Sequence, residues 1–195
     1  MNTKHSLENR VPPGQHLTSA FPVLHYGEVP YYRDVSSQWN LRLFGLVEEE
    51  AVISHDEFMK LPRRTYGNDI HCVTTWSKLD NEWEGVAVAT VLERVKIKPE
   101  AKYVMLHAEH GWTTNLPLED FLRDTSFLAI KHNGEALSPE HGYPVRMVVP
   151  HLYFWKSAKW LRSIEFRETD RPGFWERNGY HMYGDPWEEQ RYDFD

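Results

Sequence analysis

Alternation of apolar and polar residues along the chain predicts several strands separated by turns. Residues 39–47 alternate in this way, which indicates a strand with one buried face. Extended structure is also favoured where β-branched and aromatic residues gather, as they do around the single cysteine. On these grounds the sequence predicts further strands at 63–66, 103–108, 127–132, 145–149 and 163–166. A turn is expected at Gly67 and Asn68, followed by an extended segment at 70–76 in which Cys72 lies on or just beyond a strand.

Helical spacing is confined to short segments. Ser54 and Glu57 have the spacing of a capping box and predict a helix that Pro62 ends. Apolar residues recur at helical intervals within 88–95. A turn is expected at 113–115, and Pro117 lies near the start of the short helix that follows it. Because strands outnumber helices and interleave irregularly with them, we expect an α+β, mixed β-rich fold with short helices.

The length of 195 residues, 41% of them hydrophobic, fits a single domain that covers 1–195. Residues 1–20 predict an extended arm, because two prolines and a glycine at 12–14 oppose regular structure. Residues 171–195 are rich in aromatic and acidic residues without clear periodicity. They predict a tail that packs on this domain or on a partner, which includes a second copy of the chain.

Charge and hydropathy exclude several classes of function. The net charge of −7 gives no basic field to attract a nucleic acid, so we expect no such partner. No apolar run approaches the ~18 residues of a membrane span. The first ten residues lack a signal-peptide core and a twin-arginine pair, which predicts a cytoplasmic location. Glycine-rich patterns for dinucleotides or nucleoside triphosphates are also missing from the sequence.

Cys72 is the one cysteine of the chain, so it serves either packing or chemistry rather than an internal disulfide. Common structural zinc sites need more cysteines, and His107 and His110 would point to opposite faces of a strand. His71 would likewise point away from its neighbour Cys72. A histidine from elsewhere in the chain leaves a Cys–His hydrolase open as an alternative.

A single thiolate also suits a soft transition metal whose other ligands come from an organic cofactor. A cofactor with a phosphate tail needs cations and hydrogen-bonding groups from several loops. Arg146 offers a planar fork to a phosphate, and Lys159 offers a compact charge. Other residues of suitable type lie at turns or strand ends, namely His25, His107, His141 and Ser157.

Three motifs in order resemble the sulfite-oxidase-type molybdopterin domain, and the resemblance covers about residues 21–166. They are HCVTTWS at 71–77 with WEGV at 83–86, HGYPVR at 141–146 with VP at 149–150, and WKSAKWL at 155–161. This family includes sulfite oxidase, nitrate reductase and the catalytic subunit of bacterial periplasmic methionine-sulfoxide reductase. The chain is most similar to short bacterial members that carry the catalytic domain and little else.

The resemblance implies a role for each candidate residue. Cys72 would be the metal ligand and catalytic residue, binding molybdenum beside the sulfurs of molybdopterin. Arg146 would hold the pterin or its phosphate. The other cofactor-binding residues that the resemblance implies are His25, His107, His141, Ser157, Ala158 and Lys159.

The implied activity is that of a molybdenum–molybdopterin oxidoreductase. It would transfer an oxygen atom, with a two-electron change, on a small-molecule S-oxide, N-oxide or oxyanion substrate. The immunoglobulin-like and haem domains of some relatives have no counterpart in this sequence, so we expect a separate electron-transfer partner. An arginine placed for an anionic substrate is also not evident, which disfavours sulfite. The alternative is a non-catalytic molybdopterin carrier that keeps the pocket without substrate access.

Overall fold

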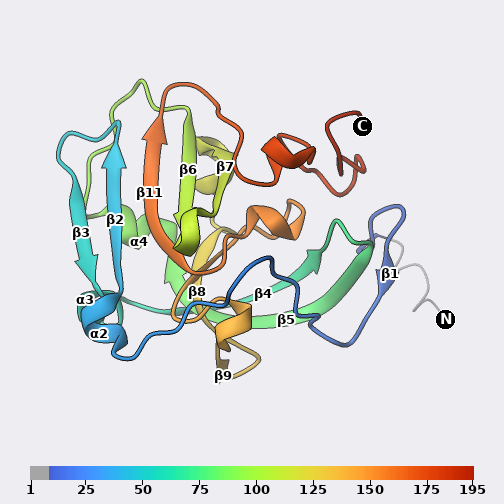
Figure 1. Ribbon diagram of the computed structural model, residues 1–195, viewed down its shortest axis with the longest axis horizontal. Helices are drawn as coiled ribbons and strands as arrows, with labels where there is room; N and C mark the ends of the chain where they lie inside the picture. Colours follow the sequence, from blue (N-terminus) through green and yellow to red (C-terminus); the bar gives the residue numbers. More distant parts are fainter. Residues whose placement is uncertain (1–8) are drawn as a thin grey trace.

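Two β-sheets form the body of the protein in the computed structural model, which describes residues 9–195 (Figure 1). In the first sheet, β5 pairs in parallel with β1 and antiparallel with β4 and β8. Strands β9 and β10 both pair with β8. The strands of this sheet are β1 (His16–Leu17), β4 (Arg64–His71), β5 (Trp76–Ala87), β8 (Phe127–His132), β9 (Glu135–Ala136) and β10 (Arg146–Val148).

The second sheet has the order β3-β2-β11-β6-β7. Strands β2 and β11 are parallel, and the other neighbours are antiparallel. Figure 1 shows its strands running roughly across β4 and β5 of the first sheet. The strands are β2 (Asn40–Gly45), β3 (Ala51–Ser54), β6 (Tyr103–Ala108), β7 (Thr113–Pro117) and β11 (Leu161–Arg167).

Helices in the described residues are short, and the mixed α+β architecture predicted from the sequence is confirmed. The predicted capping box forms, with Ser54 N donating to Glu57 Oε2 at 2.9 Å and Glu57 N donating to Ser54 Oγ at 3.3 Å. The α-helices are α2 (Val35–Gln38), α3 (His55–Phe58), α4 (Val88–Leu92) and α5 (Leu118–Phe121). The 3-10 helices are η1 (Glu109–Gly111), η2 (Pro139–His141), η3 (Phe154–Lys156) and η4 (Glu176–Asn178). None of the helices in residues 9–195 is long and apolar enough to cross a membrane.

The main hydrophobic core lies between the two sheets. Leu41 and Leu43 alternate with more exposed residues along β2, as the predicted half-buried strand requires. They belong to the same buried cluster as Val86 of β5 and Leu128 of β8, so both sheets contribute to one core. A second, smaller cluster packs beneath Cys72 and includes aromatic side chains of β5, β8 and η3.

Two local predictions were wrong. The turn expected at Gly67 and Asn68 is absent, because both residues pair with β5 within an uninterrupted β4. Residues 113–115, predicted as a turn, form β7 against β6. In both cases pairing with the neighbouring strand outweighs the local turn preference. Cys72 lies just beyond β4, as the sequence predicts.

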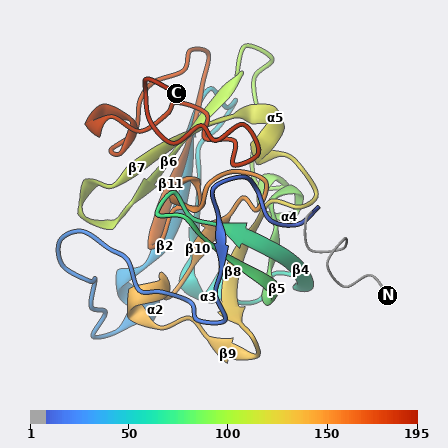
Figure 2. The same cartoon turned by 90° about the vertical axis from the view of Figure 1, so that its right-hand side faces the viewer.

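The arm and the tail lie on the same side of the molecule (Figures 1 and 2). Strand β1 is the part of the predicted arm that joins a sheet, and residues 1–8 lie outside the described residues. The tail packs against its own domain, since Tyr153 N donates to Gly184 O at 2.8 Å and Phe174 N donates to Thr113 O at 2.8 Å. Whether it also contacts a partner stays a prediction.

Gly85 supplies a test of sheet packing. A Cβ at Gly85 would lie 2.5 Å from Leu128 O and 2.9 Å from the Phe127 ring, whereas a Cβ at Gly67 would meet nothing within 4 Å. We expect Gly85→Ala to lower the free energy of unfolding by about 1–3 kcal/mol, because β8 must move to admit the methyl group. Gly67→Ala, the matched control, should change it little. Urea unfolding followed by tryptophan fluorescence measures both, and equal midpoints for the two variants would contradict this account of the packing.

Candidate functional site

A turn after β4 places Cys72 at the wall of a cavity. Cys72 N donates to Trp76 O at 2.9 Å, and Thr75 N donates to Cys72 O at 3.0 Å. Thr75 has a φ of 73°, a left-handed conformation that is uncommon for a β-branched residue. The thiol is nearly buried, with Sγ 3.1 Å from Thr74 Oγ1. The turn therefore holds a lone sulfur at the end of a rigid strand.

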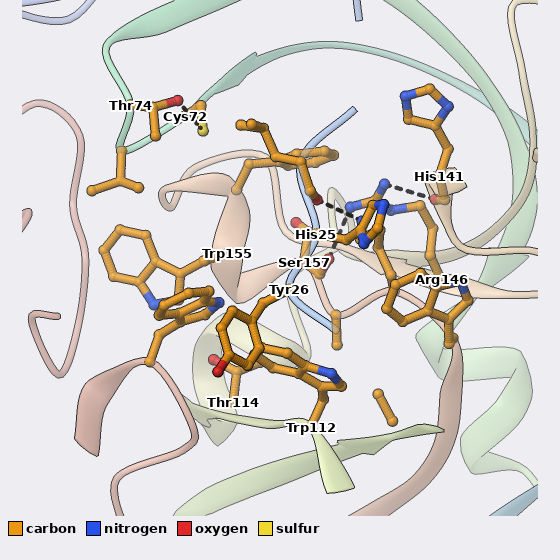
Figure 3. Close-up of a pocket in the computed structure, with 18 of the residues that line it drawn as sticks. His25, Tyr26, Cys72, Thr74, Trp112, Thr114, His141, Arg146, Trp155 and Ser157 are labelled. Carbon is orange, nitrogen blue, oxygen red and sulfur yellow. Dashed lines mark hydrogen bonds between the residues drawn. The ribbon is translucent and has the colours of Figure 1, made fainter. Parts of the chain in front are cut away.

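The cavity has a volume of about 350 Å³ and is lined mainly by aromatic and other apolar side chains. Figure 3 shows Cys72 and Thr74 at one end of it, and Arg146 and His141 at the other. Its wall is assembled from segments far apart in the sequence. These are residues 21–26, the Cys72 turn, the β6–β7 connection, residues 141–146 and 154–160, and the C-terminal tail.

Arg146 is a buried cation with carbonyl partners. Its guanidinium donates to His141 O and to Ser157 O, both at 2.9 Å, and lies 4.3 Å from the centre of the Phe154 ring. Among residues 9–195 no carboxylate pairs with it. Burial lowers the pKa of Arg146 to about 9, so the group remains charged at neutral pH.

Lys159 lies beside Arg146 and is held in a similar way. Its Nζ donates to Leu24 O at 2.7 Å and to Glu140 O at 2.9 Å. Burial and the charge of Arg146 lower the pKa of Lys159 to about 7, against a smaller opposing effect of the Glu140 carboxylate. In the described part of the chain, this ammonium forms no ion pair within 4.0 Å.

Gly142 allows the two cationic residues to approach each other. It has a φ of 112°, and a Cβ there would lie 3.0 Å from Arg146 Cβ and 3.2 Å from Lys159 Cα. Arg146 is buried and Lys159 is half-buried, and two such neighbouring cations without a carboxylate are costly unless an anion joins them. This end of the cavity therefore fits the phosphate of a cofactor, and the opposite end offers a thiol ligand to a soft metal.

Three other predicted residues stabilise this end of the cavity through backbone and side-chain hydrogen bonds. His141 lines it and stacks on Phe21 with ring centres 4.1 Å apart. Its Nε2 lies 3.2 Å from Phe21 O, which can only accept, so the imidazole donates there and its Nδ1 accepts from Ser138 Oγ. Ser157 Oγ accepts from Val149 N at 2.9 Å, and Ala158 O accepts from Met147 N at 2.8 Å.

The remaining two predicted residues lie in different places. His25 is exposed on a loop that lines the cavity, and its Nδ1 donates to Gly27 O at 3.1 Å. His107 does not line the cavity. Its Nε2 lies 2.9 Å from Glu165 Oε2, and its ring packs 5.6 Å from that of Phe44. The structure thus brings together all the predicted site residues except His107.

Aromatic residues of the C-terminal tail also line the cavity, and sequence reasoning missed them. Trp175 and Tyr180 stack with ring centres 4.9 Å apart, and Tyr180 meets Trp155 edge-on at 5.0 Å. Burial raises the pKa of the Tyr180 phenol, with smaller contributions from Tyr192 and Cys72. Aromatic enrichment in the tail was the only signal, and without periodicity it could not place one ring.

Glu176 attaches this part of the tail to the domain. Its Oε1 accepts from Lys156 Nζ at 2.7 Å, from Trp155 Nε1 at 2.9 Å and from Thr114 Oγ1 at 3.0 Å. The side chains of Lys156 and Glu176 are 1% and 0% exposed. Removing one member of such a buried pair typically costs about 3–5 kcal/mol, so this contact fixes the wall of the cavity that the tail provides.

The contacts of Cys72 oppose the hydrolase alternative. No histidine of the described residues bonds to its thiol, and burial raises the pKa of Cys72, whereas a nucleophilic cysteine needs a lowered pKa. His71 instead lies 2.8 Å from Ser77 Oγ, and burial lowers its pKa to about 4. Within residues 9–195, no three His, Cys, Asp or Glu side chains converge as a metal site. A metal at Cys72 would need ligands from a cofactor.

Comparison with known proteins identifies the family. The family described as the oxidoreductase molybdopterin binding domain matches residues 26–175. The chain belongs to this family. The uncharacterized oxidoreductase YuiH of Bacillus subtilis is 60% identical over 186 residues, which cover 95% of this chain and 93% of that protein. The family predicted from the three motifs is therefore confirmed, and with it the classification as an oxidoreductase.

More distant relatives are longer than this chain. The protein-methionine-sulfoxide reductase catalytic subunit MsrP of Campylobacter jejuni is 25% identical over 166 residues, covering 76% of this chain and 56% of that protein. The sulfane dehydrogenase SoxCD of Paracoccus pantotrophus has a similar fold, with a TM-score of 0.68 and 24% identity. That match covers 80% of this chain and 43% of the dehydrogenase chain, and it confirms the predicted sulfite-oxidase-like fold.

The pKa of Lys159 predicts a pH-dependent affinity for anions. Sulfate, which stays a dianion near neutral pH, should bind the cofactor-free cavity more weakly as the pH rises through about 7, because Lys159 loses its charge there. For one linked proton the affinity falls by up to about tenfold per pH unit above the pKa. Calorimetry measures this dependence, and Lys159→Met should remove most of it. The control is Lys96→Met, at an exposed lysine that pairs with Glu48. A sulfate affinity that is constant across this range in the unaltered protein would contradict the assignment.

Proposed function

We propose that this protein is a molybdenum–molybdopterin oxidoreductase that exchanges an oxygen atom with a neutral organic S-oxide or N-oxide. The observation that carries the proposal is the arrangement of one cavity with Cys72 at one end and Arg146 at the other. Lys159 adds a second positive charge beside Arg146. A thiolate and two cations without carboxylate partners match a metal at one end and a phosphate at the other.

Each of these residues has a distinct task in holding the cofactor. Cys72 would give up its proton and ligate the metal, since a thiol is deprotonated on coordination. Arg146 and Lys159 would hold the phosphate, and the carbonyls that already orient them would keep their charges in place. When bound, the metal–pterin group supplies a two-electron redox centre able to exchange oxygen with a substrate.

The surroundings of the thiol favour a neutral substrate. Thr74, Trp155 and Tyr180 line the cavity near Cys72, and all three are uncharged. The positively charged side chains of the lining lie at the other end, where the cofactor phosphate would neutralise them. The name of the Campylobacter relative assigns it an S-oxide as substrate. An S-oxide or N-oxide therefore suits this site better than sulfite or nitrate.

Tyr180 is suited to act on the substrate oxygen. A tyrosine phenol is protonated at neutral pH, and burial raises the pKa of Tyr180 further, so its hydroxyl is available as a donor. Its hydroxyl has no hydrogen-bond partner among the described residues, and its ring lines the cavity. Reduction of an S-oxide consumes two electrons and two protons and yields a thioether and water. We assign the electrons to a separate partner protein; the predicted cytoplasmic location stays a prediction.

Cys72→Ser tests the catalytic assignment. We expect turnover of methionine sulfoxide or trimethylamine N-oxide, followed with a reduced redox dye, to be abolished because the metal loses its thiolate. Pterin content should fall far less, since Arg146 and Lys159 still hold the phosphate. Full activity in the variant would overturn the assignment. Metal-loaded wild-type protein that is inactive on all substrates would favour the carrier alternative, and faster turnover of sulfite or nitrate would contradict the substrate class.

Tyr180→Phe tests the proposed proton donor. Loss of the hydroxyl should lower kcat by about 10²-fold or more, the usual contribution of a positioned acid, with a smaller change in KM. Tyr192→Phe is the matched control, because Tyr192 also lies in the tail, contacts Tyr180 and does not line the cavity. Equal kcat values for the two variants would remove Tyr180 from the reaction.

A further inference from the structure

Segments from the N-terminal arm and the C-terminal tail meet at the turn that carries Cys72. Gln15, in the N-terminal arm, donates from Nε2 to Cys72 O at 3.0 Å. Arg191, in the C-terminal tail, donates from one terminal nitrogen to Val73 O at 3.1 Å and from the other to Pro13 O at 3.2 Å. One guanidinium thus joins the tail, the arm and the turn.

The arm makes further backbone contacts with the same turn. His16 N donates to Thr75 O at 2.8 Å, and the pairing continues into β5 through Thr18 N and Ser77 O at 3.0 Å. With the bonds from Gln15 and Arg191, the carbonyls of residues 72, 73 and 75 all accept from a chain end. Segments distant in sequence therefore fix the turn through these three carbonyls.

Close packing of arm and tail keeps these donors in place. Gly14 has a φ of 67°, and a Cβ there would lie 2.6 Å from Glu189 Oε1 and 3.0 Å from an Arg191 terminal nitrogen. The Arg191 guanidinium lies 4.9 Å from the centre of the Tyr153 ring, and its side chain is only 12% exposed. Arg191 is therefore an ordered, nearly buried group rather than a mobile surface arginine.

The turn needs such support because its own bonds are few. Within residues 72–76, the backbone bonds are those from Cys72 N to Trp76 O and from Thr75 N to Cys72 O. Thr75 also holds a positive φ, which costs about 1 kcal/mol or more for a residue that is not glycine. A metal ligand must keep its sulfur within about 0.5 Å of the productive position, which this turn could not guarantee alone.

We propose that Arg191 and Gln15 are positioning residues that fix the direction of the Cys72 thiol by tying its turn to both chain ends. Neither residue lines the cavity, so both act through the turn rather than on substrate or cofactor. The proposal rests on the proposed function in one respect, the role of Cys72 as the metal ligand. Its structural part, that the chain ends restrain the turn, is independent of that role.

Amide hydrogen exchange tests the structural part in the protein as purified. In Arg191→Met, which keeps the length of the side chain but loses its donors, we expect the peptide covering residues 71–76 to exchange about tenfold faster or more. Arg191→Lys keeps one donor nitrogen in place of two, so it should restore part of the protection of the 71–76 peptide against exchange. Arg177→Met is the control, at a tail arginine whose side chain donates to Pro172 O at 3.4 Å and to no other group of residues 9–195. In this variant the 71–76 peptide should exchange as in the unaltered protein.

Gln15→Leu gives a second route if the tail variant fails to fold. It removes the donor to Cys72 O from the arm alone and should also speed exchange of the 71–76 peptide. Peptides of β6 should be unchanged in every variant. If the 71–76 peptide exchanges at the unaltered rate in folded Arg191→Met and in Gln15→Leu, the proposal is overturned.

The consequence for the metal is measured by electron paramagnetic resonance of the holoenzyme. A tilted thiolate should change the signal of the metal centre and lower kcat about tenfold with little change in KM, while Arg177→Met changes neither. Faster exchange with an unchanged signal would show that the turn is restrained but that Cys72 orientation does not depend on it, which also overturns the proposal. Failure of the proposed function is seen separately, as full activity in Cys72→Ser.

Discussion

A buried guanidinium that has no carboxylate partner within residues 9–195 is the constraint around which this site is organised. The guanidinium of Arg146 donates to three carbonyls and lies over the Phe154 ring, and Lys159 beside it donates to two more carbonyls. Carbonyl dipoles orient a cation but do not neutralise it, so the cavity keeps a net positive charge at this end. An anion that binds here relieves the cost of burial and stabilises the folded state by mass action.

The same constraint explains which backbone features the motifs carry. Gly142 is required where Arg146 and Lys159 converge. The Ser157 hydroxyl accepts from Val149 N, and this bond holds in place the Ser157 carbonyl that accepts from Arg146. The motif residues therefore divide into a few groups that face the cavity and others that hold those groups in position. The chain ends belong to the second kind at Cys72, and through Trp175 and Tyr180 the tail also supplies a wall.

Much of the fold follows from local patterns. Alternation at 39–47 and the capping box at Ser54 were enough to locate β2 and α3, because burial of one face and satisfaction of helix amides are local requirements. The turn at Gly67 and Asn68 failed for the opposite reason. Pairing with β5 along the whole strand outweighs the turn preference of two residues.

The candidate site residues that belong to the sequence motifs could be predicted. Those whose positions depend on tertiary contacts could not. The sequence located Cys72, Arg146 and Lys159, since the chemistry of a thiolate and two cations can be inferred from residue type. His107 does not line the cavity, because its ring pairs with Glu165 on the neighbouring strand β11, away from the cavity. Tyr180 could not be found, because its place depends on the buried pair that anchors the tail at Glu176.

X-ray absorption at the molybdenum edge tests the central claim most directly. The account predicts that the purified protein contains molybdenum bound by several sulfurs, and that Cys72→Ser loses one sulfur while keeping those of the pterin. A protein without molybdenum after expression in cells that make the cofactor would contradict it. So would an unchanged number of sulfur ligands in the variant, because the metal would then not depend on Cys72.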